Sequence, residues 1–314
     1  MKIKNILIIL FGLSITANAQ QKVIESLQRP HLIGICKAAF FTKDTGANHN
    51  FYSNYLGFAG MDFGEHFNTV IKINSRQCLE LIPEKITGGN RLSHFSVETN
   101  DAEAMRKYLF QKKIVVPKVI TKDTKGNRFF FITDPNGTVC EFIQYKKETI
   151  TTKKNSWNDS SIAQHMSHVG FMVADVDKAI DFYCGVLGFT ETWRGSKDGK
   201  NVTWVNLKVP DGRDYIELML YDKEQSDENM GVLNHICLEV DDVTVSAQTL
   251  KNRTLPKGCK QTTAMKTGIN KKRQINCYDI DGTRVEIMEA QTSDGQPAPS
   301  STAIPLKFVV QRQL

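Results

Sequence analysis

The sequence lacks the closely spaced cysteine pairs that mark a zinc ribbon or a disulfide framework. It contains no CxxC spacing, and its cysteines are odd in number: Cys36, Cys78, Cys140, Cys184, Cys237, Cys259 and Cys277. Most of them lie inside apolar, strand-like runs, so we expect buried free thiols. An exported protein could still form a disulfide, and the spacing alone does not exclude one.

A strong excess of one charge is also missing. The formal charge of +6 falls to +4 when Lys2 and Lys4 are removed with the N-terminal leader described below. The lysine pairs are scattered along the chain and form no basic stripe, which is typical of solvated surface. The composition therefore indicates no nucleic-acid partner. We expect a small-molecule substrate and a monomer or homodimer.

Long hydrophobic runs are absent except at the N-terminus. There a basic start is followed by an apolar run over 6–15 and by small residues at Ala17 and Ala19. This pattern predicts a secretory signal peptide over 1–19, cleaved after Ala19. The run is too short to remain as a membrane span. We therefore expect an exported protein, periplasmic or secreted, with no membrane association after cleavage.

One short phrase occurs twice in the chain. The segment "NFYSNYLGF" at 50–58 returns as "DFYCGVLGF" at 181–189, so the two Phe-Tyr pairs are 131 residues apart. Around each copy the chain shows two units with the order strand, helix and further strands, which makes four units in all. Helices are expected over 44–56, 101–113, 178–186 and 244–251, with Asp101, Asp177 and Asp242 at helix starts.

The repeats divide the chain of 314 residues into two domains. We predict an N-terminal domain over 30–147, a polar linker over 148–165, a C-terminal domain over 166–290 and a surface or disordered tail over 291–314. The segments "DPNG" (134–137) and "DIDG" (279–282) predict turns between paired strands.

Ionisable residues recur at matching places in the last two units. The strands alternate, with one apolar face and one face that carries a single charged or imidazole side chain. His168 and His235 lie in the opening strands of units three and four, and Glu217 and Glu286 lie in the closing strands. Each residue alone is more typical of a hydrogen-bonded cavity residue or a surface charge. Four at equivalent positions indicate two imidazoles and two carboxylates around one divalent ion, such as Zn, Ni, Co, Mn or Fe.

These features resemble the vicinal oxygen chelate superfamily, which includes glyoxalase I, bleomycin-binding proteins and extradiol ring-cleaving dioxygenases. The resemblance rests on the four units, the opening "H-x-G-F-x-V…FY…LGF" and the closing "D-x-x-G-x-x-x-E", and it covers about residues 30–290. It implies an α+β fold of four βαβββ modules paired into two U-shaped half-barrels. It also implies one metal ion held by His168, Glu217, His235 and Glu286.

The N-terminal half does not repeat this set. Its matching positions are Lys37, Glu80, His94 and Glu141. A protonated lysine cannot ligate a metal, and its ammonium would instead lie between the two carboxylates. We predict a degenerate site and a structural role for this half. A three-ligand site or a ligand-binding pocket remains the alternative.

For the reaction, the resemblance implies a metal that polarises a substrate through neighbouring oxygens. Glu286 or Glu217 would move a proton, as in glyoxalase-like lyases, isomerases and epimerases. An extradiol dioxygenase using His168, His235 and Glu286 is the main rival. Its accessory tyrosine position is Asn276 here, and no histidine follows His235. A metal-free binding protein of the bleomycin-resistance type is the third possibility.

Side chains that could bind an anionic, carboxylated or phenolic substrate are expected on strands that border the cavity. These residues are Trp193, Arg194, Trp204, Asn206 and Arg273. The two tryptophans could equally be core residues.

Overall fold

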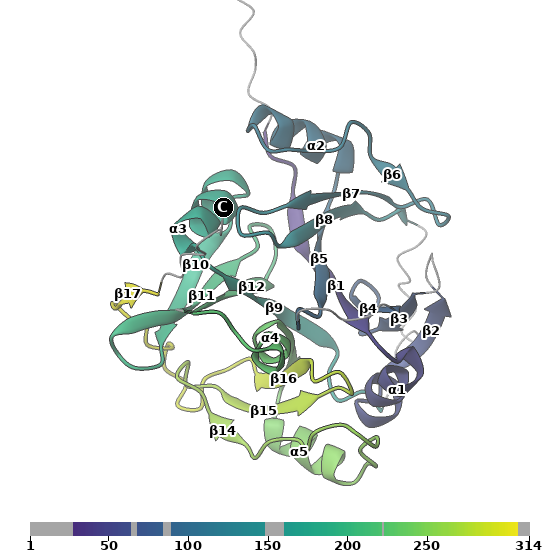
Figure 1. Ribbon diagram of the computed structural model, residues 1–314, viewed down its shortest axis with the longest axis vertical. Helices are drawn as coiled ribbons and strands as arrows, with labels where there is room; N and C mark the ends of the chain where they lie inside the picture. Colours follow the sequence, from purple (N-terminus) through teal and green to yellow (C-terminus); the bar gives the residue numbers. More distant parts are fainter. Residues whose placement is uncertain (1–27, 64–67, 84–88, 148–159, 222, 307–314) are drawn as a thin grey trace, which may run out of the picture.

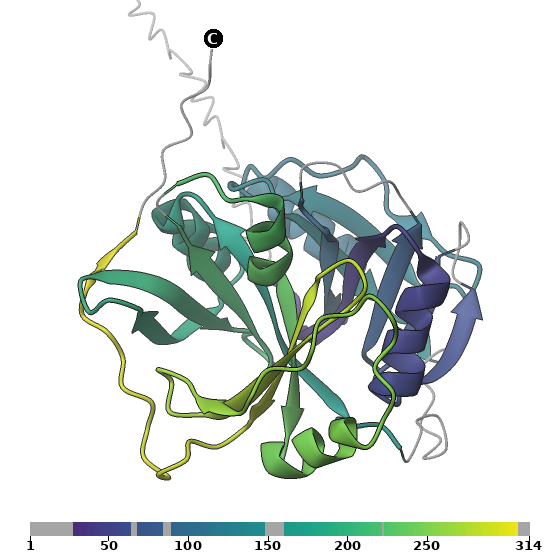
Figure 2. The same ribbon diagram turned by 60° about the horizontal axis from the view of Figure 1, so that its bottom comes forward.

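The structure is a computed structural model that describes residues 28–63, 68–83, 89–147, 160–221 and 223–306. It consists of two strongly curled sheets that lie side by side, with helices on their outer faces (Figures 1 and 2). The predicted signal peptide and most of the predicted linker lie outside the described residues. Within the described part, no helix is long and apolar enough to cross a membrane.

The N-terminal sheet has eight strands. In spatial order they are β2 (Ala59–Phe63), β3 (Thr69–Lys72), β4 (Cys78–Pro83), β1 (Leu32–Thr42), β5 (Leu92–Thr99), β8 (Val139–Gln144), β7 (Arg128–Thr133) and β6 (Thr121–Lys122).

The C-terminal sheet repeats this order. Its strands are β10 (Thr190–Ser196), β11 (Asn201–Lys208), β12 (Tyr215–Leu220), β9 (His165–Val173), β13 (His235–Val240), β16 (Arg284–Glu289), β15 (Arg273–Tyr278) and β14 (Lys266–Thr267), with β17 (Ile304–Pro305) added to β11. The opening and closing strands of each module run parallel, and the two modules meet through antiparallel opening strands. The predicted α+β fold of four modules in two half-barrels is therefore confirmed.

Each predicted helix is present with small differences in its bounds. The helices are α1 (Thr45–His49) continued by the π-helical η1 (Asn50–Tyr55), α2 (Ala102–Gln111), α3 (Val176–Ile180) continued by η4 (Asp181–Val186), and α5 (Val243–Lys251). The third helix begins earlier than predicted: Asp175, not Asp177, is its N-cap and accepts a hydrogen bond from the Lys178 N–H. A short helix that was not predicted, α4 (Asp227–Leu233), precedes β13.

The repeated segments 50–58 and 181–189 each form the end of a helix, and a tyrosine in each segment contacts the other half of the chain. Gly57 and Gly188 have φ values of 83° and 77°, a conformation that glycine adopts most readily and that stops a helix. The Tyr52 hydroxyl donates to Asp279 in the turn between β15 and β16, and the Tyr183 hydroxyl donates to Asp134 in the turn between β7 and β8. Each copy of the phrase thus holds a turn of the opposite sheet.

One hydrophobic core runs through both halves. It includes Phe95 of β5 and Phe171 of β9, whose rings stack with centroids 5.3 Å apart. Phe182 and Tyr183 are buried in it, which confirms the prediction that they are packing residues. All seven cysteines are free, and those at 36, 140, 237 and 277 are buried. The described part of the C-terminal tail includes β17, which pairs in parallel with Asn201 and Val202 of β11.

Candidate metal centre

The four predicted ligand residues lie on four neighbouring strands of the C-terminal sheet. His168 is on β9, Glu217 on β12, His235 on β13 and Glu286 on β16. Apolar residues alternate with them along these strands and enter the core, so the ligand side chains point to the concave face. The register then brings the strands together: Glu217 and His235 both pair with Gly170, while Cys237 pairs with both His168 and Glu286.

The side-chain atoms converge on one point. The Nε2 atoms of His168 and His235 are 3.2 Å apart. The carboxylate of Glu217 is 3.4 Å from His235 Nε2 and 4.0 Å from His168 Nε2. The carboxylate of Glu286 is 3.5 Å from His168 Nε2 and 4.0 Å from His235 Nε2. Ligands about 2.1 Å from a common ion lie roughly 3 to 4 Å from each other, so these separations fit one metal ion.

Both imidazoles are in the neutral form that a metal requires. Burial holds the pKa of His168 well below its usual value, although Glu217 opposes this. Burial, reinforced by Arg284, lowers the pKa of His235 to about 3. His235 Nδ1 lies 2.9 Å from the Leu233 carbonyl oxygen, which can only accept, so Nδ1 carries the proton and Nε2 presents a lone pair. The donor set therefore fits a divalent cation in charge state and direction.

Gly170 makes room for one of these rings. A Cβ atom on Gly170 would lie 1.9 Å from His235 Cε1. Any larger residue would displace the imidazole. This close approach explains the glycine in the sequence "HVGF" on β9.

Cys237 is a neighbour of the site that the sequence did not single out. Its sulfur and one ligand atom each of His168 and Glu286 lie within 4.8 Å of one another. Burial, followed by the charge of Glu286, raises the thiol pKa well above its usual value. Without a metal ion, Cys237 is thus a neutral thiol beside the carboxylate.

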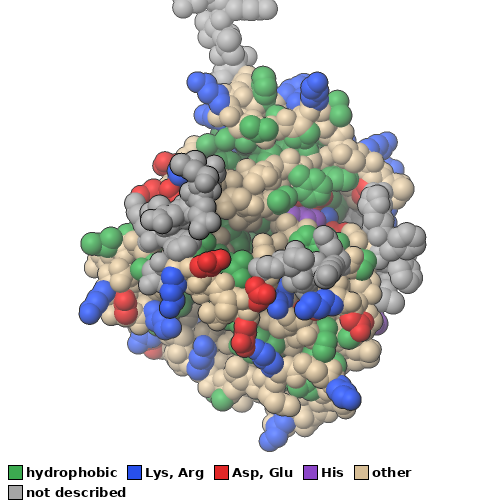
Figure 3. Space-filling view, viewed as in Figure 1, with side chains coloured by type: hydrophobic (Ala, Val, Ile, Leu, Met, Phe, Trp, Pro, Cys, Tyr) green, Lys and Arg blue, Asp and Glu red, His purple; other side chains and the backbone are tan. Residues whose placement is uncertain are grey.

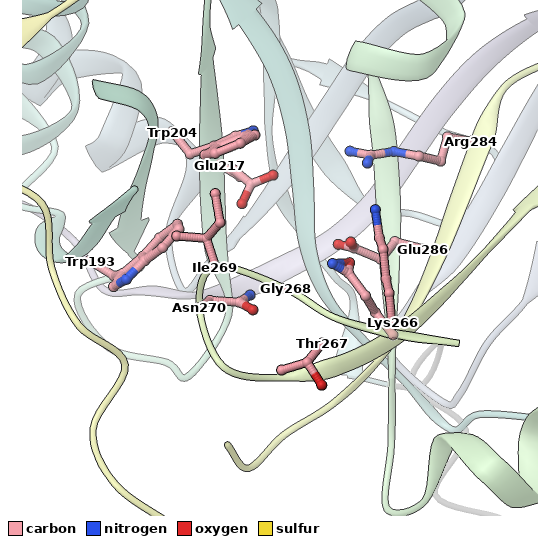
Figure 4. Close-up of a pocket in the computed structure, with 11 residues that line it drawn as sticks. Trp193, Trp204, Glu217, Lys266, Thr267, Gly268, Ile269, Asn270, Arg284 and Glu286 are labelled. Carbon is pink, nitrogen blue, oxygen red and sulfur yellow. The ribbon is translucent and has the colours of Figure 1, made fainter. Parts of the chain in front are cut away.

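A cavity of about 240 Å³ opens above the two glutamates. Figure 4 shows Trp193 and Trp204 on one side, and Arg284 and Lys266 on the other, with Glu217 and Glu286 between them. The segment Gly268–Ile269–Asn270 lies along its remaining side. The cavity therefore combines an apolar wall, two carboxylates and two cations.

The predicted substrate-binding residues separate into two groups. Trp193 and Trp204 line the cavity, while Asn206 lies buried on the same face, opposite Glu217, and its Oδ1 has no partner among the described atoms. Arg194 and Arg273 do not reach the cavity. Each alternates with a cavity-facing residue on its strand, and each instead pairs with a glutamate, Glu191 or Glu289.

The cations at the cavity are Lys266 and Arg284, which the sequence analysis did not propose for substrate binding. The position of Arg284 could have been predicted from strand alternation. Arg284 lies two residues before Glu286 on β16, so both side chains point to the same face of the sheet. No local pattern marks Lys266, since it reaches the cavity only through the fold of the segment before β15.

The N-terminal counterparts also come together, but around a lysine. Lys37 Nζ is 3.2 Å from Glu80 and 3.0 Å from Glu141. Burial lowers the lysine pKa, but Glu141 and Glu80 outweigh this and raise it above its usual value. Lys37 is therefore a permanent cation in this place. Ala39, which pairs with His94, stands where Gly170 pairs with His235 in the other half.

Comparisons with known proteins agree with this geometry. Residues 165–287 match the family model "Glyoxalase/Bleomycin resistance protein/Dioxygenase superfamily". A search of curated protein sequences gives no match. Among solved structures, the 2,3-dioxygenase LapB from Pseudomonas sp. KL28 is similar, with a TM-score of 0.65, 14% identity, and coverage of 86% of this chain and 97% of that chain.

Two further solved structures show the same likeness. A variant of homoprotocatechuate 2,3-dioxygenase from B. fuscum has a TM-score of 0.64 at 14% identity, with coverage of 87% of this chain and 76% of that chain. A catechol 2,3-dioxygenase has a TM-score of 0.64 at 13% identity, covering 89% and 94%. At such low identity the likeness establishes the fold of both halves and leaves the reaction open.

Proposed function

We propose that this chain is a divalent-metal-dependent enzyme with its site in the C-terminal half, where residues 165–287 match the model of the glyoxalase/bleomycin resistance protein/dioxygenase superfamily. The observation that carries the proposal is the convergence of two buried Nε2 atoms, 3.2 Å apart, with two carboxylates. His168, Glu217, His235 and Glu286 would hold one ion of Zn, Ni, Co, Mn or Fe. When bound, the ion would polarise substrate oxygens and stabilise negative charge on them.

The first candidate reaction is a lyase, isomerase or epimerase reaction that depends on proton transfer. Glu217 and Glu286 line the cavity, and Tyr and His are missing from the described residues that do so. A glutamate is thus the side chain available to take a proton from a substrate carbon and to return it. The tryptophans would hold the apolar part of the substrate and exclude water from this step.

The substrate is proposed to be a small anion that carries neighbouring oxygen atoms. Arg284 and Lys266 border the cavity of about 240 Å³ and offset the charge of the two glutamates. Their positive charge favours a carboxylate or phenolate group at that side. The volume restricts the ligand to a small molecule.

The second candidate is an extradiol ring-cleaving dioxygenase with His168, His235 and Glu286 as ligands. The dioxygenase names of solved structures that share the fold over most of the chain are the reason to consider it. The residues around the site disfavour this reaction. Asn276, which pairs with Glu286, occupies the position where an extradiol dioxygenase is expected to have its accessory tyrosine. A metal-free binding protein is the third candidate, and the complete donor set counts against it.

Metal content per chain, measured by elemental mass spectrometry on protein purified without chelators, is the decisive experiment. About one ion per chain is expected. Iron together with oxygen uptake on catechols would select the dioxygenase, whereas zinc, nickel or cobalt without oxygen uptake would select the proton-transfer enzyme. Absence of metal after incubation with each ion would overturn the proposal. Export is part of the proposal, and recovery of the protein from the periplasm or medium with residues 1–19 removed would support it.

A further inference from the structure

A second cavity, larger than the one beside the metal ligands, lies in the N-terminal half. This second cavity has a volume of about 570 Å³ and lies on the concave face of the N-terminal sheet. Its polar floor contains Lys37, Glu80, His94 and Glu141. Apolar side chains form much of its wall, among them Val70, Ile82, Phe129, Phe131 and Ile143. In Figure 3, hydrophobic side chains flank a histidine side chain on the part of this face formed by the N-terminal half.

The floor of this cavity holds the Lys37 ammonium at the position where the other half has the ligand His168. The Lys37 ammonium is held by both carboxylates at 3.2 and 3.0 Å. Asn68 donates to Glu80 at 2.7 Å, and the Ser96 hydroxyl donates to Glu141. These contacts satisfy both carboxylates without a metal. A lysine that stays protonated also offers no nucleophile.

His94 supplies the polar atom that has no protein partner. Its side chain is 8% exposed, and Nε2 has no hydrogen-bond partner among the described residues. The nearest carboxylate oxygen, on Glu80, is 3.9 Å away and beyond hydrogen-bond distance. A buried ring nitrogen without a partner costs free energy, which a ligand in the cavity would recover.

An aromatic surface stands directly beside this atom. The Phe131 ring meets the His94 ring edge to face at 5.1 Å and the Phe129 ring at 5.7 Å. Phe131 is 40% exposed, so part of its ring is open to a ligand. A flat apolar group could stack there while its polar end reaches His94.

The net charge of the cavity floor indicates which ligand charges the cavity can accept. One lysine and two glutamates leave the floor with a net charge of −1, because burial keeps His94 neutral by lowering its pKa. At the rim, Asp123 and Lys125 offset each other. A carboxylate on the ligand would therefore be repelled, whereas a hydroxyl or an ammonium group would find acceptors.

We propose that the N-terminal half is a metal-free binding site for a small aromatic molecule that carries a hydroxyl or amino group. Lys37 stands where the other half has the metal ligand His168. His94 contacts the hydroxyl or amino group of the bound molecule, and Phe129 and Phe131 contact its aromatic ring. The two halves thus share a fold and differ in ligand: one binds a metal and an anion, the other a neutral or cationic aromatic compound.

Three matched probes test this directly on the full chain: benzyl alcohol, benzylamine and benzoate, with binding followed by saturation-transfer NMR titration. At the N-terminal cavity, benzyl alcohol and benzylamine should bind, and benzoate should bind at least tenfold more weakly. Phe131→Ala should weaken binding of the first two at least tenfold, because it removes the exposed ring while leaving the core intact. His94→Phe should weaken binding as well, since it keeps the ring and removes the nitrogen.

The matched control is Trp204→Ala, which changes the C-terminal cavity alone. It should leave the affinity for benzyl alcohol and benzylamine unchanged. Thermal melting of each variant checks that it is folded. Failure of both benzyl alcohol and benzylamine to bind would overturn the proposal. Benzoate binding of equal strength that Phe131→Ala weakens would overturn it too, because that benzoate would occupy the N-terminal cavity. So would a loss of benzyl alcohol binding in Trp204→Ala in place of Phe131→Ala.

Discussion

At the scale of single residues, the ligand set makes the most direct prediction. Glu286→Ala and His235→Ala should each lower bound metal from about one ion per chain to a small fraction, because each removes a ligand that both candidate reactions require. Elemental mass spectrometry after gel filtration measures the loss. Lys37→Ala is the control and should keep the metal, since Lys37 belongs to the other sheet. Full metal retention in Glu286→Ala would reject the site.

Gly170 tests the same site through packing alone. Gly170→Ala places a methyl group where the His235 ring lies, with a distance of 1.9 Å between Cβ and Cε1 before relaxation. The ring must move, so metal affinity should fall at least tenfold. A competition titration with a chelator measures this affinity. Gly185→Ala, where a Cβ would meet nothing within 4 Å, provides the control and should retain the wild-type value.

Two residues of β1 distinguish the N-terminal half from the metal site of the C-terminal half. Lys37 replaces the histidine, and Ala39 fills the space that Gly170 leaves for the second imidazole. We expect Lys37→His combined with Ala39→Gly to raise metal content from about one to about two ions per chain. Ala39→Gly alone should leave it at one. No increase in the double variant would show that the carboxylates of this half are oriented for the lysine only.

At the scale of elements, the helix phrases and the D-x-x-G turns brace the two sheets against each other. Asp279 accepts from the N–H groups of Asp281 and Thr283 and from the Tyr52 hydroxyl. Burial raises its pKa from 3.8 to about 7, and Asp281 adds to this. The folded state therefore binds this proton more tightly than the unfolded state does.

The free energy of unfolding should therefore depend on pH through the protonation of Asp279. The contribution of Asp279 is full below about pH 4 and is lost as the pH rises to about 7, so its ionisation destabilises the fold by on the order of 1–4 kcal/mol. Asp279→Asn keeps an acceptor oxygen and removes the titration. The difference in unfolding free energy between this variant and the wild type should therefore shift in favour of the variant between pH 5 and pH 8. Urea unfolding at each pH measures it, and a constant difference would contradict the prediction.

At the scale of the whole molecule, the shared core predicts that the two halves unfold together. Phe95 of the N-terminal sheet stacks on Phe171 of the C-terminal sheet. Phe95→Ala should lower the free energy of unfolding by about 3–5 kcal/mol. The described N-terminal residues contain no tryptophan, whereas Trp193 and Trp204 lie in the C-terminal sheet. Tryptophan fluorescence should still shift to a lower urea midpoint in this variant, and an unchanged midpoint would show that the halves unfold independently.

Much of this organisation could be predicted from the sequence because it depends on local and periodic patterns. The repeat at 131 residues indicated the duplication, strand alternation put His168, Glu217, His235 and Glu286 on one face, and the "DPNG" and "DIDG" segments predicted the turns. These features follow from backbone geometry, in which successive strand residues point to opposite sides. The same rule would have placed Arg284 in the cavity and Arg194 and Arg273 outside it.

Other features depend on segments that are distant in the sequence, and only the tertiary structure decided them. The pairing of each helix phrase with a turn of the opposite sheet, the Lys266 contact with the cavity and the larger volume of the N-terminal cavity all arise from how the two sheets pack and curl. Residue type and spacing determine what a side chain can do. Which groups it meets is settled only when the chain has buried its core, because that step sets distances between residues with no sequence relationship.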